Sequence, residues 1–265
     1  MKVFICDIDG TFFSHETYSI PHLDEVKLAF SKLVINNIPI IFATARVLEG
    51  CFSIIKTLDL DNSKTYCVSG NGSEIYYDKY LYESIVPLEM IKKVHDLSSK
   101  IDLAMAVDQK DYLLIEKFDA ALEDDRLSLP IDLVLPHDFL SSIKYPVHKV
   151  SLTSDNEITE IFPVVYDALS SEVNVCKAGK DYIDITMPYH NKAYGVKKLL
   201  ELLNIEDSKV YYIGDSHNDL ELMAMADVAA CVDNAIDLCK DICQIHVKSC
   251  EEGGIIDFID WIISD

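Results

Sequence analysis

Long hydrophobic runs are absent from this chain. No uncharged apolar stretch in its 265 residues approaches the roughly 20 residues that a membrane-spanning helix requires. Only four apolar residues, Val3 to Cys6, precede Asp7, which is too few for the hydrophobic region of a signal peptide. We therefore expect a cytoplasmic protein.

Basic residues are also scarce. The chain has 23 Lys and Arg against 45 Asp and Glu, so its formal net charge is -22. Such a surface repels nucleic-acid backbones and anionic lipid headgroups, and we expect neither nucleic-acid nor membrane partners. An anionic substrate would then need local positive charge from a metal ion, a lysine or helix N-termini.

The sequence lacks internal repeats, Gly/Ser tracts and long charge runs of one sign, which excludes linker-like and low-complexity architectures. Hydrophobic residues make up 49% of the chain, enough to build a sizeable core. The eight cysteines do not resemble the disulfide framework of a small secreted domain. Several, such as Cys6 and Cys67, lie in apolar runs where a thiol packs as a small hydrophobe.

Short apolar runs alternate with amphipathic stretches at both ends of the sequence, which is typical of a parallel sheet with crossover helices. The predicted strands are 3–6, 38–43, 65–68, 210–213, 228–231 and 245–247, and the predicted helices are 23–34, 48–58, 192–203 and 219–225. Ligands of such sheets bind beyond the carboxyl ends of the strands.

The middle of the chain has a different pattern. Alternating segments at 103–107, 112–116, 148–153 and 182–185 flank helical stretches at 88–99 and 158–169. This pattern indicates an α+β insertion with an antiparallel sheet. We predict a catalytic core formed by 1–83 and 189–265, interrupted by an inserted domain at 84–188.

Two carboxylates follow the first predicted strand. Strand alternation places Asp7 and Asp9 on the same side, where they need a cation or a shared proton to coexist. Taken alone, the Asp9-Gly10 pair is more typical of an ordinary turn. After the second strand, Thr44 and Arg46 begin a predicted helix and could meet a phosphate, although an N-cap and a surface arginine are the simpler interpretation.

Further polar residues mark the second half of the core. Asn191-Lys192 begins an amphipathic helix, and the following strand ends in a turn rich in oxygen ligands, with Asp215 and Asp219. Carboxylate oxygens suit Mg²⁺ rather than zinc. Asp215 is thus the natural partner of Asp7.

In this order, the motifs resemble the four motifs of the haloacid dehalogenase (HAD) superfamily of phosphatases. They are Asp7-Ile8-Asp9-Gly10-Thr11, Thr44, Lys192 and Gly214-Asp215-Ser216-His217-Asn218-Asp219. The large insertion, together with Asn71-Gly72 and 252–255, is similar to the Cof-type (IIB) branch, whose cap is of the C2 kind. The resemblance implies a Rossmann-like parallel-sheet core with an α+β cap that determines substrate specificity.

The resemblance also implies roles for individual residues. Asp7 would be the nucleophile that forms an aspartyl-phosphate, and Asp9 would protonate the leaving oxygen and later activate water. Thr44 and Lys192 would complete the catalytic set by holding phosphate oxygens. Arg46 and Asn218 are further candidates for phosphate binding.

A Mg²⁺ ion would be held by Asp7, by the backbone carbonyl of Asp9 and by Asp215, with Asp219 as a further ligand or a carboxylate behind them. Four aspartates and a substrate phosphate carry more negative charge than Lys192 can offset. Without a divalent cation, the site should not bind substrate.

Three features depart from the family pattern. Ala45 replaces the glycine of a Thr-Gly-Arg motif, and its methyl group would perturb Thr44 if the backbone there required positive φ. Phe12 and Phe13 follow the first motif, and we interpret them as packing residues or as a wall beside the substrate. The segment 228–234 lacks the glycine that is frequent in the family.

Cys239, Cys243, His246 and Cys250 form a C-x3-C-x2-H-x3-C pattern that suggests zinc. The spacing departs from the tight C-x2-C knuckle, so we favour ordinary packing. His217, inside the fourth motif, is interpreted as a solvent-exposed residue.

The sequence therefore predicts a Mg²⁺-dependent phosphatase that acts on a small phosphorylated metabolite, with a sugar phosphate as one candidate. A phosphomutase using the same intermediate is the alternative within enzymes. A non-catalytic module that binds metal or phosphate for regulation is the alternative outside them, although the inserted domain and Lys192 favour turnover.

Overall fold

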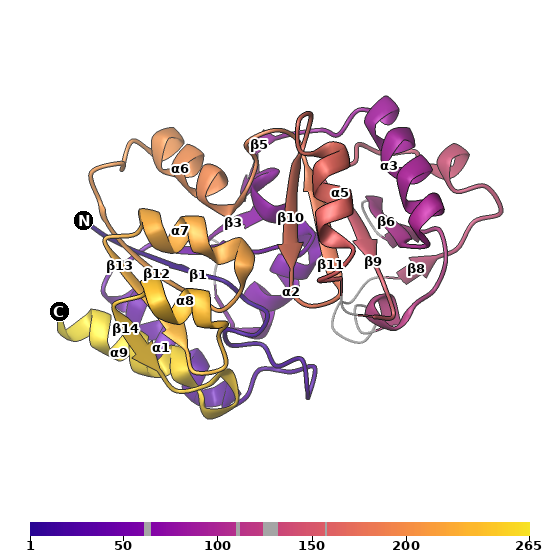
Figure 1. The fold of residues 1–265 in the computed structure, drawn as a ribbon. Helices are drawn as coiled ribbons and strands as arrows, with labels where there is room; N and C mark the ends of the chain where they lie inside the picture. Colours follow the sequence, from indigo (N-terminus) through magenta and orange to yellow (C-terminus); the bar gives the residue numbers. More distant parts are fainter. Residues whose placement is uncertain (61–64, 110–111, 124–131, 157) are drawn as a thin grey trace.

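The computed structural model describes residues 1–60, 65–109, 112–123, 132–156 and 158–265, which form two lobes with one sheet each (Figure 1). The larger sheet has the strand order β14-β13-β12-β1-β2-β3-β4-β5. Its strands are β1 (Lys2–Cys6), β2 (Ile40–Ala43), β3 (Thr65–Ser69), β4 (Glu74–Tyr77), β5 (Lys79–Glu83), β12 (Lys209–Gly214), β13 (Val228–Val232) and β14 (Ile245–Val247).

The strands from β14 to β3 are parallel, and they confirm the predicted core. The chain winds outward from β1 to β3 in one direction and from β12 to β14 in the other. Right-handed crossovers then place the helices of the two halves on opposite faces of the sheet. Helices α1 (Leu23–Ile35) and α2 (Leu48–Thr57) lie on one face, and α6 (Lys192–Leu203), α7 (Leu220–Met225) and α8 (Asp237–Ile242) lie on the other, whereas the C-terminal helix α9 (Gly254–Ser264) packs beside α1.

The direction of winding reverses between β1 and β12, which are adjacent. In open α/β sheets, such a switch point leaves a crevice at the carboxyl ends of the strands. At the other edge, β4 and β5 form an antiparallel hairpin that the sequence analysis did not predict.

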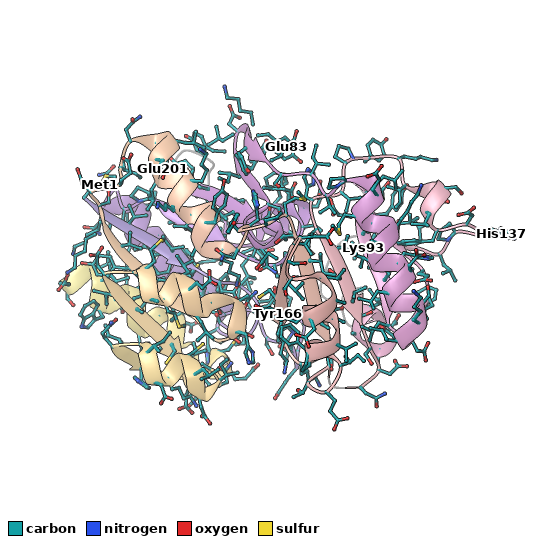
Figure 2. The ribbon with its side chains drawn as sticks, turned by 45° about the horizontal axis from the view of Figure 1, so that its top comes forward. Met1, Glu83, Lys93, His137, Tyr166 and Glu201 are labelled. Carbon is teal, nitrogen blue, oxygen red and sulfur yellow. The ribbon has the colours of Figure 1, made fainter. Side chains whose placement is uncertain are left out.

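The smaller sheet has the order β10-β11-β9-β6-β7-β8 and is antiparallel except for the parallel pair β7 and β8. Its strands are β6 (Ala104–Gln109), β7 (Tyr112–Ile115), β8 (Asp132–Val134), β9 (Val150–Thr153), β10 (Asn174–Ala178) and β11 (Tyr182–Thr186). Helices α3 (Leu88–Ile101) and α5 (Phe162–Leu169) pack on it and carry Lys93 and Tyr166 in Figure 2. The predicted antiparallel sheet thus holds for all but one strand pair.

Alternation along these strands gives the smaller sheet two different faces. Val150 and Leu152 belong to the apolar cluster under α3 and α5. Ala104 and Ala106 point the other way, and they pack with Val47 of the core. The small sheet therefore lies face-on against the carboxyl ends of the core strands.

An acidic cluster surrounds His148 at the junction of the two lobes. His148 Nδ1 lies 3.2 Å from Asp108 Oδ2 and 3.4 Å from Glu74 Oε1, and Nε2 lies 3.2 Å from Glu83 Oε2. Burial alone would lower the pKa of His148, but these neighbours outweigh it and raise the pKa to about 9. A protonated imidazole therefore links the lobes at neutral pH.

No helix among the described residues combines the length and the apolar character needed to span a bilayer.

Candidate active site

The carboxyl edge of the sheet at the switch point carries residues that directly follow three core strands. Asp7 follows β1, Thr44 follows β2 and Asp215 follows β12. These residues come from distant parts of the chain. They lie close together because parallel strands present their carboxyl ends at one edge of the sheet. Oxygens of Asp7, Asp215 and Asp219 all lie within 4.8 Å of one another.

Lys192 joins two of these carboxylates. The side chain of Asn191 caps α6 by accepting from Tyr194 N at 2.8 Å, which makes Lys192 the first residue of the helix. Lys192 Nζ donates to Asp7 Oδ1 at 2.6 Å and to Asp219 Oδ1 at 2.7 Å. Burial would lower the pKa of Lys192, but the attraction of the two carboxylates raises it, so the ammonium group stays charged.

Asp219 is fully engaged by the protein itself. Besides Lys192, Tyr212 donates its hydroxyl to Oδ1 at 2.6 Å. Oδ2 accepts the backbone N-H groups of Asp215 at 2.8 Å and of Ser216 at 2.9 Å. With four donors on its two oxygens, Asp219 holds Lys192 and the loop at Asp215 and Ser216 in place. This arrangement favours Asp219 as a carboxylate behind the metal ligands rather than as a ligand itself.

Asp7 and Asp215 are crowded by like charge. Burial, opposed by Lys192 and reinforced by Asp219, raises the pKa of Asp7 to about 7. Burial and the charges of Asp219 and Asp7 also raise the pKa of Asp215 well above its usual range. One lysine does not neutralise three carboxylates, and their oxygen-only donor set fits a hard divalent cation such as Mg²⁺.

Gly10 and Thr11 shape the space around Asp215. Gly10 has φ +75°, and a Cβ atom there would lie 2.5 Å from Asp215 Oδ2. Thr11 Oγ1 donates to Asp215 Oδ1 at 2.9 Å, which leaves Oδ2 on the side facing Gly10. The first motif therefore needs glycine for both its backbone conformation and the close approach of this carboxylate.

Arg46 binds Asp9 with two parallel hydrogen bonds. Arg46 Nε donates to Oδ2 at 2.8 Å, Nη2 donates to Oδ1 at 2.7 Å, and the guanidinium group lies 4.3 Å from the centre of the Phe13 ring. Burial would raise the pKa of Asp9, but Arg46 outweighs it and lowers the pKa. Arg46 was expected to meet a phosphate, and in this arrangement its fork instead holds Asp9 as a carboxylate.

Thr44 is fully buried beside this pair. Its N-H donates to Val68 O at 2.9 Å, and its Oγ1 accepts the N-H of Arg46 at 3.1 Å. Ala45 is not among the residues with positive φ, so the conformation of this turn does not require glycine and the methyl group leaves Thr44 in place.

Asn218, the other candidate for phosphate binding, belongs to a chain of polar contacts between the lobes. Asn218 Nδ2 donates to Asn71 Oδ1 at 3.1 Å, and Asn71 Nδ2 donates to Asp184 Oδ2 at 2.5 Å. Asp184 lies on the core-facing side of the small sheet and also accepts Lys149 Nζ at 3.0 Å. Lys149 in turn reaches Ala45 O at 2.9 Å, so the small sheet contacts the second motif directly.

Sequence reasoning missed the roles of Tyr212 and Asn234. Tyr212 lies in an apolar strand and gives no sign of its hydrogen bond to Asp219. Asn234 Nδ2 donates to Gly10 O at 2.7 Å and its Oδ1 accepts Cys250 N at 2.8 Å, which ties the 228–234 loop to the first motif. The only available signal was the position of Asn234 just beyond a core strand.

The expectations for Phe12, Phe13 and His217 have different outcomes. Phe12 is buried and packs against Phe30 and Phe42, which makes it a core residue, whereas Phe13 lies under Arg46. His217 is only partly exposed, and burial, aided by Lys177 of the small sheet, lowers its pKa.

The predicted cysteine pattern does not form one group. Cys239 Sγ donates to Ser216 O at 3.2 Å, and Cys250 N donates to Asn234. Cys231, which the pattern omitted, lies with Cys243 and His246 instead. The register of β13 and β14 places Cys231 beside His246, and residue spacing in the sequence does not reveal that register.

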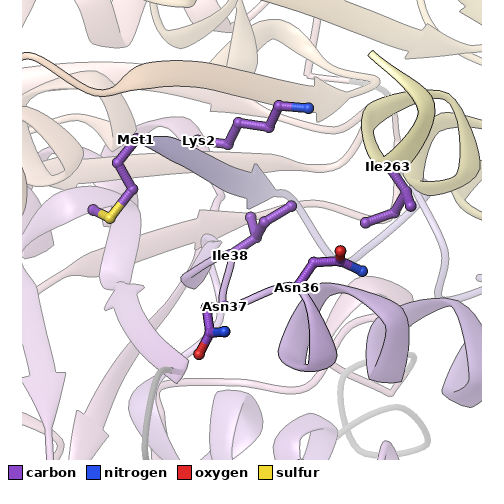
Figure 3. A pocket seen from close by; sticks show the side chains of 6 residues that line it. All are labelled: Met1, Lys2, Asn36, Asn37, Ile38 and Ile263. Atoms are coloured by element: carbon purple, nitrogen blue, oxygen red, sulfur yellow. The ribbon is translucent and has the colours of Figure 1, made fainter.

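A separate pocket of about 240 Å³ lies at the amino ends of β1 and β2 (Figure 3). It is lined by Met1, Lys2, Asn36, Asn37, Ile38 and Ile263. Its one charged side chain, Lys2, donates to Ile262 O at 2.9 Å. This pocket is at the opposite edge of the sheet from the carboxylates and contributes none of the proposed chemistry.

The family model of haloacid dehalogenase-like hydrolases matches residues 4–259. The chloroplastic endoribonuclease YBEY of Arabidopsis thaliana is 24% identical over 96% of this chain, which spans only 45% of that protein. The Escherichia coli 5-amino-6-(5-phospho-D-ribitylamino)uracil phosphatase YbjI is 22% identical to this chain. The alignment covers 99% of this chain and 96% of YbjI.

Among solved structures, the HAD subclass IIB sugar phosphatase BT4131 aligns with a TM-score of 0.82 and 18% identity over 99% of both chains. This similarity shows the same fold, including the inserted small-sheet lobe. The family match identifies the chain as a member of the haloacid dehalogenase-like hydrolases, and the shared fold agrees with this assignment.

Proposed function

We propose that the protein is a Mg²⁺-dependent phosphatase that hydrolyses a small phosphorylated metabolite through an aspartyl-phosphate on Asp7. The observation that carries this proposal is the convergence of Asp7, Asp215 and Lys192 at the switch point of the sheet. Asp7 and Asp215, with the backbone carbonyl of Asp9, would hold the metal. The bound Mg²⁺ supplies the positive charge that a site with three carboxylates needs before it can accept a phosphate.

The side chains of this chain account for the other requirements of phosphoryl transfer. Lys192 fixes one oxygen of Asp7 and orients the nucleophile. Asp9, held ionised by Arg46, is in the form that accepts a proton from the water that hydrolyses the intermediate. Thr44 and Lys192 would hold phosphate oxygens. Phosphoryl transfer depends mainly on such positioning and charge stabilisation.

The small-sheet lobe, which we assign to the inserted domain 84–188, would exclude water and select the organic part of the substrate. Its core-facing side contacts the second motif through Lys149 and buries Val47. On the same side, Ser151 Oγ donates to Asp184 Oδ1 at 2.9 Å, and both residues are buried. The fold shared with a sugar phosphatase favours a sugar phosphate as the substrate.

The test is phosphate release from a panel of sugar and other phosphate esters, with and without EDTA. Asp7→Asn should abolish release while the far-ultraviolet circular dichroism stays unchanged, and Asp24→Asn on the exposed side of α1 is the matched control. Activity that persists in Asp7→Asn would exclude the mechanism. Transfer of phosphate between positions of a sugar, without release to water, would instead identify a phosphomutase.

A further inference from the structure

Two thiols and an imidazole converge at the outer edge of the core sheet, away from the catalytic carboxylates. Cys231 Sγ lies 2.6 Å from Cys243 Sγ and 3.9 Å from His246 Nδ1. One ligand atom from each of the three residues lies within 4.8 Å of the others. All three residues lie in a single strand-helix-strand unit, β13-α8-β14.

The backbone fixes this convergence. Cys231 and His246 are paired directly across the parallel strands β13 and β14, so their side chains leave the sheet on the same face. Cys243 is the C-cap of α8, the helix that connects the two strands. Its neighbour Gln244 ties this turn to β13, because Gln244 N donates to Ala229 O at 2.9 Å and Gln244 Oε1 accepts Ala229 N at 2.6 Å. The donors are thus held by regular structure rather than by a loose loop.

We propose that Cys231, Cys243 and His246 bind one soft or borderline divalent metal ion, with Zn²⁺ as the reference ion. Tetrahedral zinc, with bonds of about 2.3 Å to sulfur and about 2.0 Å to nitrogen, places sulfur and nitrogen about 3.5 Å apart and two sulfurs about 3.8 Å apart. The sulfur–nitrogen distance of 3.9 Å is already close to this value. The two sulfurs need to separate by about 1 Å, which side-chain rotation allows because Cys243 and His246 are not buried.

The third donor decides between a metal ion and a disulfide. Two thiols at 2.6 Å are too close for an unbonded pair. The contact is relieved either when the two sulfurs separate to bind one ion or when they form an S–S bond. An imidazole nitrogen directed at the pair serves an ion but has no part in a disulfide. On binding, the ion takes up both thiolates and the neutral imidazole, and the two thiol protons pass to solvent. Water completes the fourth position on the exposed side.

This site differs in chemistry from the catalytic one. Thiolates and imidazole select Zn²⁺, Cd²⁺ or Co²⁺, whereas the oxygen-only set of Asp7 and Asp215 selects Mg²⁺. The two sites are nevertheless connected, because α8 begins beside the fourth motif. Ile236 N donates to Asp215 O at 2.9 Å, and Cys239 Sγ donates to Ser216 O. An ion at the end of α8 would therefore brace the loop that carries Asp215.

The experiment uses the full chain, reduced and freed of metal. Co²⁺ should produce a sulfur-to-metal charge-transfer band and the visible bands of a tetrahedral ion, and Zn²⁺ should abolish both at one equivalent per chain. Competition with a chromophoric chelator gives the Zn²⁺ affinity. We expect Cys231→Ser and Cys243→Ser to weaken it by more than about 100-fold and His246→Gln by about 10- to 100-fold.

Two controls separate this site from other thiols and from the catalytic carboxylates. Cys176→Ser, in the small sheet, and Asp7→Asn should both keep the wild-type Zn²⁺ affinity. If the buried Cys231→Ser variant does not fold, the exposed His246→Gln variant and the wild-type Co²⁺ spectrum still decide the question. Zn²⁺ should also raise the melting temperature of the wild type and not that of Cys243→Ser.

Three results would overturn the proposal. One is a Co²⁺ complex without a charge-transfer band, and another is a Zn²⁺ affinity that His246→Gln and Cys243→Ser leave unchanged. The third is an intact mass, measured without reductant after exposure to Zn²⁺, that is lower by two hydrogens in the wild type and not in Cys243→Ser. That mass would assign a disulfide instead.

Discussion

Replacing Arg46 by methionine tests how the protein sets the pKa of Asp9. The pair is largely shielded from water, since the Arg46 side chain is 4% exposed and that of Asp9 is 26% exposed. Opposite unit charges about 4 Å apart attract by about 4 kcal/mol at an effective dielectric constant of 20. This energy corresponds to a change of about 3 in pKa. Because Asp9 is partly solvated, we expect its pKa to rise by about 1 to 2 in Arg46→Met.

The assay is kcat/KM for a phosphate ester as a function of pH. Arg46 favours the ionised form of Asp9. Its removal should therefore move the limb of the pH–rate profile that Asp9 governs to higher pH, by about 1 to 2 pH units. Arg46→Lys is the matched control, because it keeps the charge and loses the paired hydrogen bonds, and its shift should be smaller. Melting curves report any loss of folding. A limb that stays at the same pH, or moves to lower pH, in Arg46→Met would refute the reasoning.

Three further changes have defined outcomes. Gly10→Ala should lower Mg²⁺-dependent phosphatase activity by at least about 10-fold in a folded protein, because the new Cβ collides with Asp215; unchanged activation by Mg²⁺ would contradict this. Tyr212→Phe should reduce the free energy of unfolding in urea by about 1.5 to 3 kcal/mol through loss of the hydrogen bond to Asp219, and an unchanged midpoint would count against it. His148 has a raised pKa in the folded protein, so its stabilising contribution is complete below about pH 6.5 and is lost as pH approaches 9. The difference in unfolding free energy between the wild type and His148→Gln should therefore shrink over that interval, and a constant difference would oppose the assignment.

The accuracy of the predicted elements followed the strength of the local hydrophobic pattern. The helix predicted at 192–203 and the strand predicted at 245–247 match α6 and β14 at both ends. The hairpin β4-β5 was missed because tyrosines and charged residues conceal its alternation. Helix α5 begins at Phe162 rather than at 158, since the preceding residues form turns before Pro163 at the first turn of the helix.

The candidate site shows the same division. Asp7, Asp9 and Asp215 could be selected because each lies just beyond the end of an apolar strand, where topology places ligands. The partner of Asp9 could not be selected, since whether Arg46 faces a ligand or a carboxylate depends on rotamers set by Phe13 and the neighbouring turn. Cys231, in an apolar strand, could be interpreted only as a packing residue, because its closeness to His246 arises from strand register and not from spacing.

The sequence by itself determined the architecture and the chemical inventory of this protein, because hydrophobic periodicity defines parallel strands and because aspartates, a lysine and a threonine follow them in a specific order. Only the tertiary structure decided which of those groups are bound by other protein side chains and which remain available to a ligand. Asp219 is taken up by four donors from separate segments, while Asp7 and Asp215 are left crowded by uncompensated charge. The physical reason is that hydrogen-bond saturation and Coulomb energies depend on distances between segments, and local sequence does not specify those distances.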